Sequence, residues 1–219
     1  MVYILHIDTS SSTGTIALAK DGAILSSAST DEARNQASTI NLMIEHVLQQ
    51  GGIKLKQLDA IAVCGGPGSY TGLRIGLATA KGLCYAMNIP LLMVNKLALL
   101  ANSKQDLHKD KYPFYIALLT ARAQEYFITV IDATGTVIVE PQHITGTDLQ
   151  LQKFEQGYFV TDSAEDTPNV FNENTIIDNG VSIDNNYWAK DAKDAFFLKK
   201  FANIAIVEPF YLKEVYTHK

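Results

Sequence analysis

The chain has 219 residues, 47% of them hydrophobic, and a formal net charge of −5 at pH 7. This length allows one large domain or two modest lobes. Lysine and arginine number 7 against 6 acidic residues in the first hundred positions, and 11 against 17 in the remainder. Neither part has the basic excess expected of a protein that binds nucleic acid by itself.

The cysteines and the N-terminal residues indicate the cellular compartment in which the protein is expected. Cys64 ends an expected strand and Cys84 lies within an expected helix, so both are predicted to be free buried thiols, which suits a reducing compartment. The first residues lack the basic segment and apolar run of a signal peptide. No stretch approaches the roughly 20 apolar residues of a membrane span. The sequence therefore predicts a soluble cytoplasmic protein that does not bind membranes.

The first hundred residues predict three strands followed by alternating helices and strands. The expected strands are residues 2–7, 15–19, 23–29, Ala60–Cys64 and Leu91–Val94. The expected helices are residues 32–50, residues 70–87 and a helix opened by Asn95. Short loops and right-handed crossovers confine this order to a mixed sheet flanked by helices. It matches a ribonuclease-H-like lobe, the building block of the actin and sugar-kinase superfamily.

A second, shorter set of elements is expected after a charged linker at residues 104–111. Its expected strands are residues 114–119, 124–131, 136–140, 158–161 and 175–177. A short helix from Thr147, polar loops at 162–174 and 178–186, a helix at 190–201 and an extended tail complete it. The predicted class is α/β, with an N-terminal lobe at 1–103 and a smaller lobe at 112–219. The last helix is a candidate to pack back on the first lobe.

The helix expected at residues 70–87 has almost no polar face, since only Arg74 and Lys81 are charged within it. Small residues recur every four positions in two stripes, Gly72/Gly76/Ala80 and Ala78/Gly82/Ala86. Such stripes allow another backbone to come close. A helix that is apolar all round is buried on more than one side. One stripe should therefore face the sheet and the other more of this chain or a partner, and the sequence leaves open which is which.

The glycine-rich loop before this helix can present backbone N–H groups to a phosphate. However, it has Thr71 at the third glycine of a dinucleotide fingerprint and lacks the Lys-Ser/Thr of a P-loop. A tight turn that brings the helix close to the sheet is an equal alternative.

Asp8 precedes a Ser/Thr-rich hairpin. In actin-like enzymes a hairpin of this kind holds phosphate and metal, but Asp8 is equally explained as a turn residue that forms hydrogen bonds with its neighbours. The corresponding loop at residues 118–124 has no acidic-glycine signature.

No constellation in the sequence predicts catalysis or metal binding. The five histidines are scattered, and none pairs with another at i+4 on a helix. Cys64 has no base near it in sequence. Ser69 departs by one position from a nucleophile elbow. The sequence therefore predicts no catalytic residue and no metal ligand.

Several motifs resemble the TsaB (YeaZ) family. They are residues 7–10 (IDTS), 59–63 (DAIAV), 66–76 (GPGSYTGLRIG) and 80–82 (AKG), with a weaker likeness at 121–126 and 209–213. Two departures are Thr120, which stands where the family has an aspartate, and Ser38, near which relatives often carry a histidine. Members are bacterial subunits of the machinery that places threonylcarbamoyl on the adenosine next to the tRNA anticodon.

The resemblance implies a non-catalytic subunit that dimerises in isolation, or binds the catalytic subunit TsaD, through the helices at 32–50 and 70–87. The implied interface residues are Gln36, Thr39, Met43, His46, Gly72, Ile75, Gly76, Thr79, Ala80 and Leu83. It also implies that the ATPase TsaE and tRNA are reached only through the complex. No cofactor is expected in the chain itself, but ATP or ADP is expected at the interface. The candidate nucleotide contacts are Asp8, Thr9, Ser10, Gly68 and Ser69.

Two other function classes stay open at this point. An actin-like ATP-dependent phosphotransferase would use Asp8 and the glycine loop. A peptidase would need a nucleophile and base pair, and the sequence does not reveal one.

Overall fold

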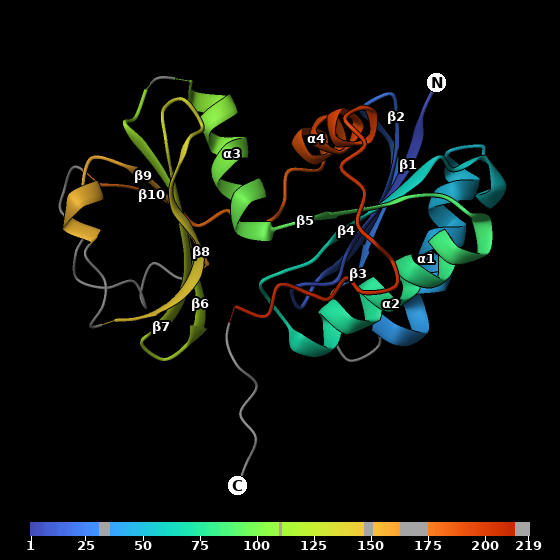
Figure 1. Cartoon of the computed structure of the whole chain (residues 1–219), viewed down its shortest axis with the longest axis horizontal. Coiled ribbons are helices and arrows are strands. Elements are labelled where there is room, and N and C mark those ends of the chain that lie inside the picture. Colours follow the sequence, from blue (N-terminus) through green and yellow to red (C-terminus); the bar gives the residue numbers. More distant parts are fainter. Residues whose placement is uncertain (31–35, 110, 147–150, 163–174, 213–219) are drawn as a thin grey trace, which may run out of the picture. The chain divides into compact units, whose positions relative to one another are not determined.

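The computed structural model describes residues 1–30, 36–109, 111–146, 151–162 and 175–212 (Figure 1). The chain divides into two compact units. The first unit contains residues 1–95 and 185–210, and the second contains residues 96–184 and 211–219. Among the described helices, none is long and apolar enough to cross a membrane.

The first unit is built on a five-stranded mixed sheet. Its elements are β1 (Tyr3–Asp8), β2 (Gly14–Lys20), β3 (Ala23–Thr30), α1 (Gln36–Gln50), η2 (Leu55–Gln57), β4 (Ala60–Cys64), α2 (Tyr70–Met87), β5 (Leu91–Val94) and α4 (Asn185–Phe197). The strand order is β3-β2-β1-β4-β5. The β1–β2 and β2–β3 pairs are antiparallel, whereas β1–β4 and β4–β5 are parallel.

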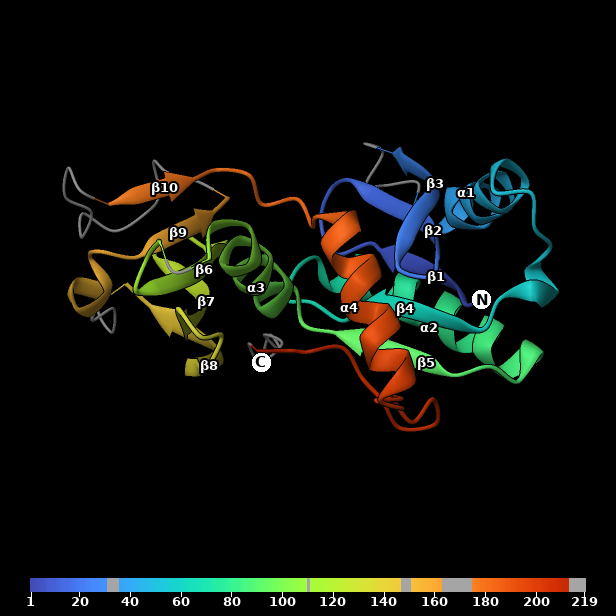
Figure 2. The ribbon, with the colours of Figure 1, turned by 90° about the horizontal axis from the view of Figure 1, so that it is seen from above.

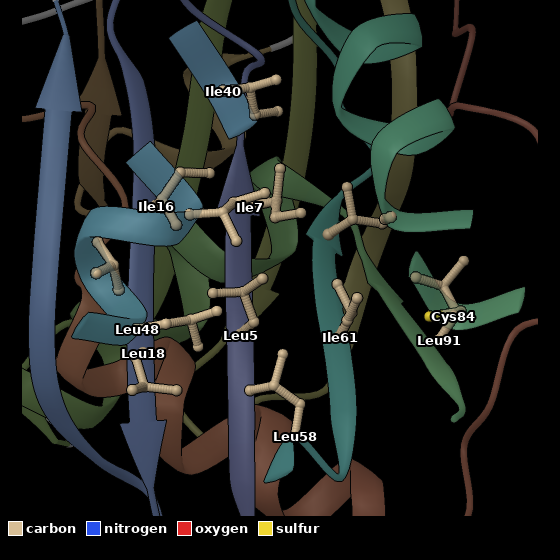
Figure 3. Packing of buried hydrophobic residues seen from close by; sticks show 14 of the residues in the cluster. Leu5, Ile7, Ile16, Leu18, Ile40, Leu48, Leu58, Ile61, Cys84 and Leu91 are labelled. Carbon is tan, nitrogen blue, oxygen red and sulfur yellow. The ribbon is translucent and has the colours of Figure 1, made fainter. Parts of the chain in front are cut away.

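Helices cover both faces of this sheet, α1 and α2 on one and α4 on the other (Figure 2). The alternation of side chains along β1 explains this arrangement. Leu5 and Ile7 belong to the apolar core shared with Ile40 of α1 (Figure 3). His6 lies between them in sequence and contacts Trp188 of α4 on the opposite face.

The second unit repeats the same strand order. Its elements are α3 (Lys96–His108), β6 (Phe114–Arg122), β7 (Glu125–Asp132), β8 (Val137–Thr145), η3 (Leu151–Phe154), β9 (Tyr158–Thr161) and β10 (Ile176–Asp178). The sheet order is β10-β9-β6-β7-β8, with β6–β9 and β9–β10 parallel. Leu97 and Leu100 of α3 share one core with Tyr115, whereas Ile116 faces a second core with Leu151. Two mixed sheets flanked by helices confirm the predicted fold class.

The division of the chain differs from the expected boundary at residues 103–112. Helix α3 continues to His108 through the expected linker, and it groups with the second unit because Leu97, Leu100 and Ala101 are buried against β6. Helix α4 groups with the first unit, where it contacts β1, β3 and β5. The short helix expected from Thr147 lies outside the described residues, as does most of the loop expected at 162–174.

Candidate partner surface and glycine loop

Helix α2 begins at a capped N-terminus and packs one small-residue stripe on the sheet. Ser69 is the N-cap, and its Oγ accepts a hydrogen bond from the Gly72 N–H at 3.2 Å. A Cβ on Gly72 would lie 2.0 Å from the carbonyl oxygen of Thr9, and one on Gly76 would lie 2.3 Å from Thr9 Oγ1. Ala80, one turn further, is completely buried. The stripe Gly72/Gly76/Ala80 therefore faces β1, and the close approach requires glycine.

The other stripe lies on the exposed side of α2. Ala78, Gly82 and Ala86 are exposed, and a Cβ on Gly82 would have no other atom within 4 Å. Tyr85 is adjacent to this stripe and has 81% of its surface exposed. The two charged residues of the helix, Arg74 and Lys81, stay at its surface. The structure thus decides what the spacing left open, and the outward stripe is Ala78/Gly82/Ala86.

Helix α1 covers the same face of the sheet and contacts α2. Leu42 is 66% exposed on its outer side, close in sequence to the half-buried Met43. Met43 of α1 and Ile75 and Leu83 of α2 pack at the edge of the core and remain partly accessible. Together, the exposed and half-buried residues of the two helices form what we call the α1/α2 surface: Thr39, Leu42, Met43, His46, Ile75, Ala78, Thr79, Gly82, Leu83, Tyr85 and Ala86.

Four residues expected at a partner surface are buried inside the first unit, and that expectation is corrected. They are Gly72, Gly76, Ala80 and Gln36. Gln36 is 3% exposed because its amide turns inward and Nε2 donates a hydrogen bond to the Ser11 carbonyl at 3.0 Å. Conversely, Tyr85 and Leu42 are exposed on the α1/α2 surface but are absent from the residues expected there. The helical spacing of Tyr85 from Ala78 and Gly82 was the signal that could have identified it.

A groove of about 610 Å³ adjoins this surface at the C-terminal end of α1. Ile44 and Leu48 of α1, Leu55 of η2 and Leu83 of α2 contribute its apolar part. Glu45 and Lys54 add one charge of each sign to a largely apolar lining. The groove extends the α1/α2 surface with a recess that can accept a side chain.

The five expected nucleotide contacts are brought together, and several of their polar groups form hydrogen bonds within the hairpin and the glycine loop, although the buried Ser10 hydroxyl has no partner. Asp8 Oδ1 accepts the Ser10 N–H at 2.9 Å, and the carbonyl oxygen of Ser10 accepts the Ser69 N–H at 2.7 Å. Thr9 Oγ1 donates to the Gly72 carbonyl at 2.7 Å. Asp8, Thr9 and Ser10 are buried, whereas Gly68 and Ser69 are exposed. The hairpin and the glycine loop thus form a closed contact, with two residues open to solvent.

The other side chains that could be reactive, the two cysteines and His6, are buried in the first unit. Cys64 and Cys84 are buried and form no disulfide, and burial raises the pKa of the Cys84 thiol to about 11, which disfavours the nucleophilic thiolate. His6 is fully buried, and burial lowers its pKa to about 3. Within the described part of the chain, no three His, Cys, Asp or Glu side chains gather where they could hold a metal ion.

Solved structures share this fold. YeaZ from Pseudomonas aeruginosa superimposes with a TM-score of 0.77, at 22% identity, over 97% of this chain and all of that one. The ethanolamine utilization protein EutJ from Carboxydothermus hydrogenoformans gives a TM-score of 0.53 at 10% identity, over 87% of this chain and 90% of that one. The likeness to YeaZ shows the fold of this chain, in which two units are each built on a five-stranded mixed sheet with helices packed against it.

Sequence comparison defines the family within that fold. Residues 24–195 match the family model of TsaD, tRNA N6-adenosine threonylcarbamoyltransferase, and the chain belongs to this family. The tRNA threonylcarbamoyladenosine biosynthesis protein TsaB of Haemophilus influenzae is 25% identical over 198 residues, which cover 85% of this chain and 83% of that protein. The resemblance to TsaB is thereby confirmed.

The enzymes of the family are matched over a shorter stretch. The tRNA N6-adenosine threonylcarbamoyltransferase of Clostridium perfringens is 33% identical over 100 residues, which cover 46% of this chain. The match spans only 30% of the length of that enzyme, whereas the match to TsaB spans most of both proteins.

Proposed function

We propose that this chain is a subunit of the complex that forms N6-threonylcarbamoyladenosine in tRNA, and that it binds and supports TsaD without an active site of its own. Membership of the TsaD family and the likeness to TsaB over most of the chain support a role in this modification. The observation that carries the binding role is the outward stripe Ala78/Gly82/Ala86 on a helix with only two charged residues.

The α1/α2 surface has the composition of a helix-packing interface. Small side chains at four-residue spacing allow a partner helix to come close, and Leu42 and Tyr85 add large exposed apolar area. Exposed apolar patches of this kind are uncommon in soluble monomers. Two helices of a partner would complete a four-helix bundle with α1 and α2, with both exposed faces inside.

The absence of an active site is supported by how the candidate groups are used. The Ser69 hydroxyl caps α2, and the Thr9 hydroxyl is bonded to the Gly72 carbonyl. Both cysteines are buried. The loop of the second unit around Thr120 lacks the acidic-glycine signature of a phosphate clamp. These observations weigh against the phosphotransferase and peptidase alternatives.

The proposal extends to the other components. In isolation, a second copy would cover the α1/α2 surface, and TsaD would replace it in the complex. TsaE and tRNA would meet the chain only through the complex, in keeping with the net charge of −5. ATP or ADP at the interface would reach Gly68 and Ser69, because these two of the five candidate residues are exposed.

The test compares two substitutions at one exposed position, Gly82→Arg and Gly82→Ala. Arginine places a long charged side chain in the outward stripe, where it should weaken association with TsaD by about tenfold or more. Alanine adds one methyl group at a position with no atom within 4 Å and serves as the matched control. Size-exclusion chromatography with light scattering measures association, and circular dichroism reports folding. If folded Gly82→Arg binds TsaD as tightly as the wild type, the interface lies elsewhere.

A further inference from the structure

A second recess lies on the opposite face of the first sheet, between β5 and α4. It has a volume of about 210 Å³. Its apolar floor includes Leu92 of β5 and Trp188 of α4, which are buried. Asp191, Asp194 and Lys200 also line it and are exposed, so they lie at its mouth. This pocket is separate from the α1/α2 surface, because α4 and the two other helices cover different faces (Figure 2).

The charged groups at the mouth interact with one another only at long range. Within the described chain, the side chains of Asp191, Asp194 and Lys200 make no hydrogen bond and no ion pair. Asp191 and Asp194 are three positions apart on one helix, so their like charges are neighbours and repel each other. Although Asp191 is exposed as a residue, partial desolvation of its carboxylate raises its pKa, with Lys200 opposing this shift and Asp194 adding to it. A ligand that neutralises these groups would stabilise the site.

We propose that this pocket binds a small zwitterion of the α-amino-acid class. The ammonium group would bind Asp191 and Asp194, the carboxylate would bind Lys200, and an aliphatic side chain would rest on the floor at Leu92. A simple cation would leave Lys200 without a partner, and a simple anion would leave the two carboxylates without one. The volume is below the roughly 300–1,000 Å³ of pockets for drug-sized ligands, which restricts the ligand to a small molecule.

Trp188 provides a direct reporter for this site. It is the single tryptophan of the chain, it lines the pocket and it is 1% exposed. Its ring contacts the His6 ring edge-on, with 4.7 Å between centroids, so its environment on the sheet side is fixed. Occupation of the pocket should change the tryptophan emission without interference from another tryptophan.

The experiment titrates the full chain with glycine, L-valine and L-leucine at millimolar concentrations and follows Trp188 emission, with calorimetry as a second measure. We expect saturable binding of L-valine. Butylamine and butyrate carry one charge each, and their affinity should be at least about tenfold lower than that of L-valine. Asp191→Asn and Lys200→Gln should each weaken L-valine binding by about tenfold. Lys190→Gln is the matched control, because Lys190 is exposed on α4 but does not line the pocket.

The outcomes separate this proposal from the proposed function. If none of the three amino acids binds saturably to the folded chain, the site is not an amino-acid pocket. Equal binding of butylamine and L-valine, unaffected by Lys200→Gln, would also overturn it. Gly82→Arg lies on α2 at the other face, so it should lose TsaD association and still bind L-valine. Failure of one proposal therefore leaves the other standing.

Discussion

Thr9 of the β1–β2 hairpin and Gly72 of α2 are in close contact in the first unit. The Thr9 hydroxyl donates a hydrogen bond to the Gly72 carbonyl at 2.7 Å, and the Thr9 carbonyl oxygen occupies the place that a Cβ at position 72 would take. This contact fixes which side of α2 packs on β1. The side left outside carries Ala78, Gly82 and Ala86, and so the candidate partner surface depends on two residues buried beneath it.

Gly72→Ala should destabilise the first unit. A methyl group at position 72 would meet the Thr9 carbonyl oxygen at 2.0 Å, which the backbone can relieve only by moving α2 from the sheet. We expect the free energy of unfolding to fall by about 3 kcal/mol. Gly82→Ala should instead raise it by about 0.5–1 kcal/mol, since alanine favours the helix and nothing lies within 4 Å. Urea unfolding of both variants measures this, and equal stabilities would contradict the assigned orientation of α2.

The buried His6 should make the first unit sensitive to acid. Its two ring nitrogens are buried without a hydrogen-bond partner, and burial lowers its pKa to about 3 from the ordinary value of 6.5. Above pH 6.5 the ring is neutral in both states. Below it the unfolded chain binds a proton that the folded chain excludes, so the free energy of unfolding falls by up to about 1.4 kcal/mol per pH unit until the folded pKa is reached.

His6→Phe should remove this acid sensitivity, because phenylalanine keeps an aromatic ring against Trp188 and carries no titrating group. Between pH 7.5 and pH 5, the variant should lose about 2 kcal/mol less stability than the wild type. Any constant packing cost of the larger ring cancels in that difference. Urea unfolding followed by circular dichroism at both pH values measures it. Parallel losses in the two proteins would mean that His6 gains a proton in the folded state.

A carboxylate in the second unit should contribute more stability than a surface ion pair. Asp178 Oδ2 accepts hydrogen bonds from the Tyr158 hydroxyl and the Lys104 ammonium, both at 2.8 Å. Asp178→Ala should therefore lower the free energy of unfolding by about 1.5–3 kcal/mol. Asp106→Ala is the control, because its contact with Lys109 is exposed and 3.9 Å long, and it should cost less than about 0.5 kcal/mol.

The pH dependence gives a further check on Asp178. Burial by itself would raise its pKa, but the hydrogen bond from Lys104, with those from Gly180 and Tyr158, lowers the pKa below the usual value. The stabilisation is therefore present above the ordinary carboxyl pKa and is lost as the pH falls through the lowered one. The difference between wild type and Asp178→Ala should shrink in acid. A difference that does not change with pH would mean that the carboxylate charge has no part in it.

The sheets could be predicted from the sequence because their signals are local. Apolar runs bounded by glycine and proline give β4 and β5 with their observed ends, and α2 also matches residue for residue. The boundary between the units was misplaced because the polar residues of 104–111 read as a linker. In the structure, Leu97 and Leu100 on the apolar side of α3 pack in the core of the second unit with Tyr115, and only contacts distant in sequence reveal that.

The candidate partner surface could be predicted only in part from the sequence, for a similar reason. Both stripes of α2 consist of glycine and alanine at the same four-residue spacing, so the spacing does not show which of them faces the sheet. The distinction comes from Thr9, which lies 63 positions away in sequence. Gln36 looked like a surface residue for the same reason, since its hydrogen bond to the Ser11 carbonyl spans 25 positions. A tertiary contact of this kind leaves no periodic trace in the sequence.

The most direct test measures N6-threonylcarbamoyladenosine in tRNA after incubation with TsaD and the remaining components, with and without this chain. The chain alone should form none, and its addition to the mixture should restore formation. Folded Gly82→Arg should restore it at least about tenfold less well, whereas Gly82→Ala should match the wild type. The account is contradicted if the chain forms the modified nucleoside without TsaD, or if folded Gly82→Arg supports the full rate.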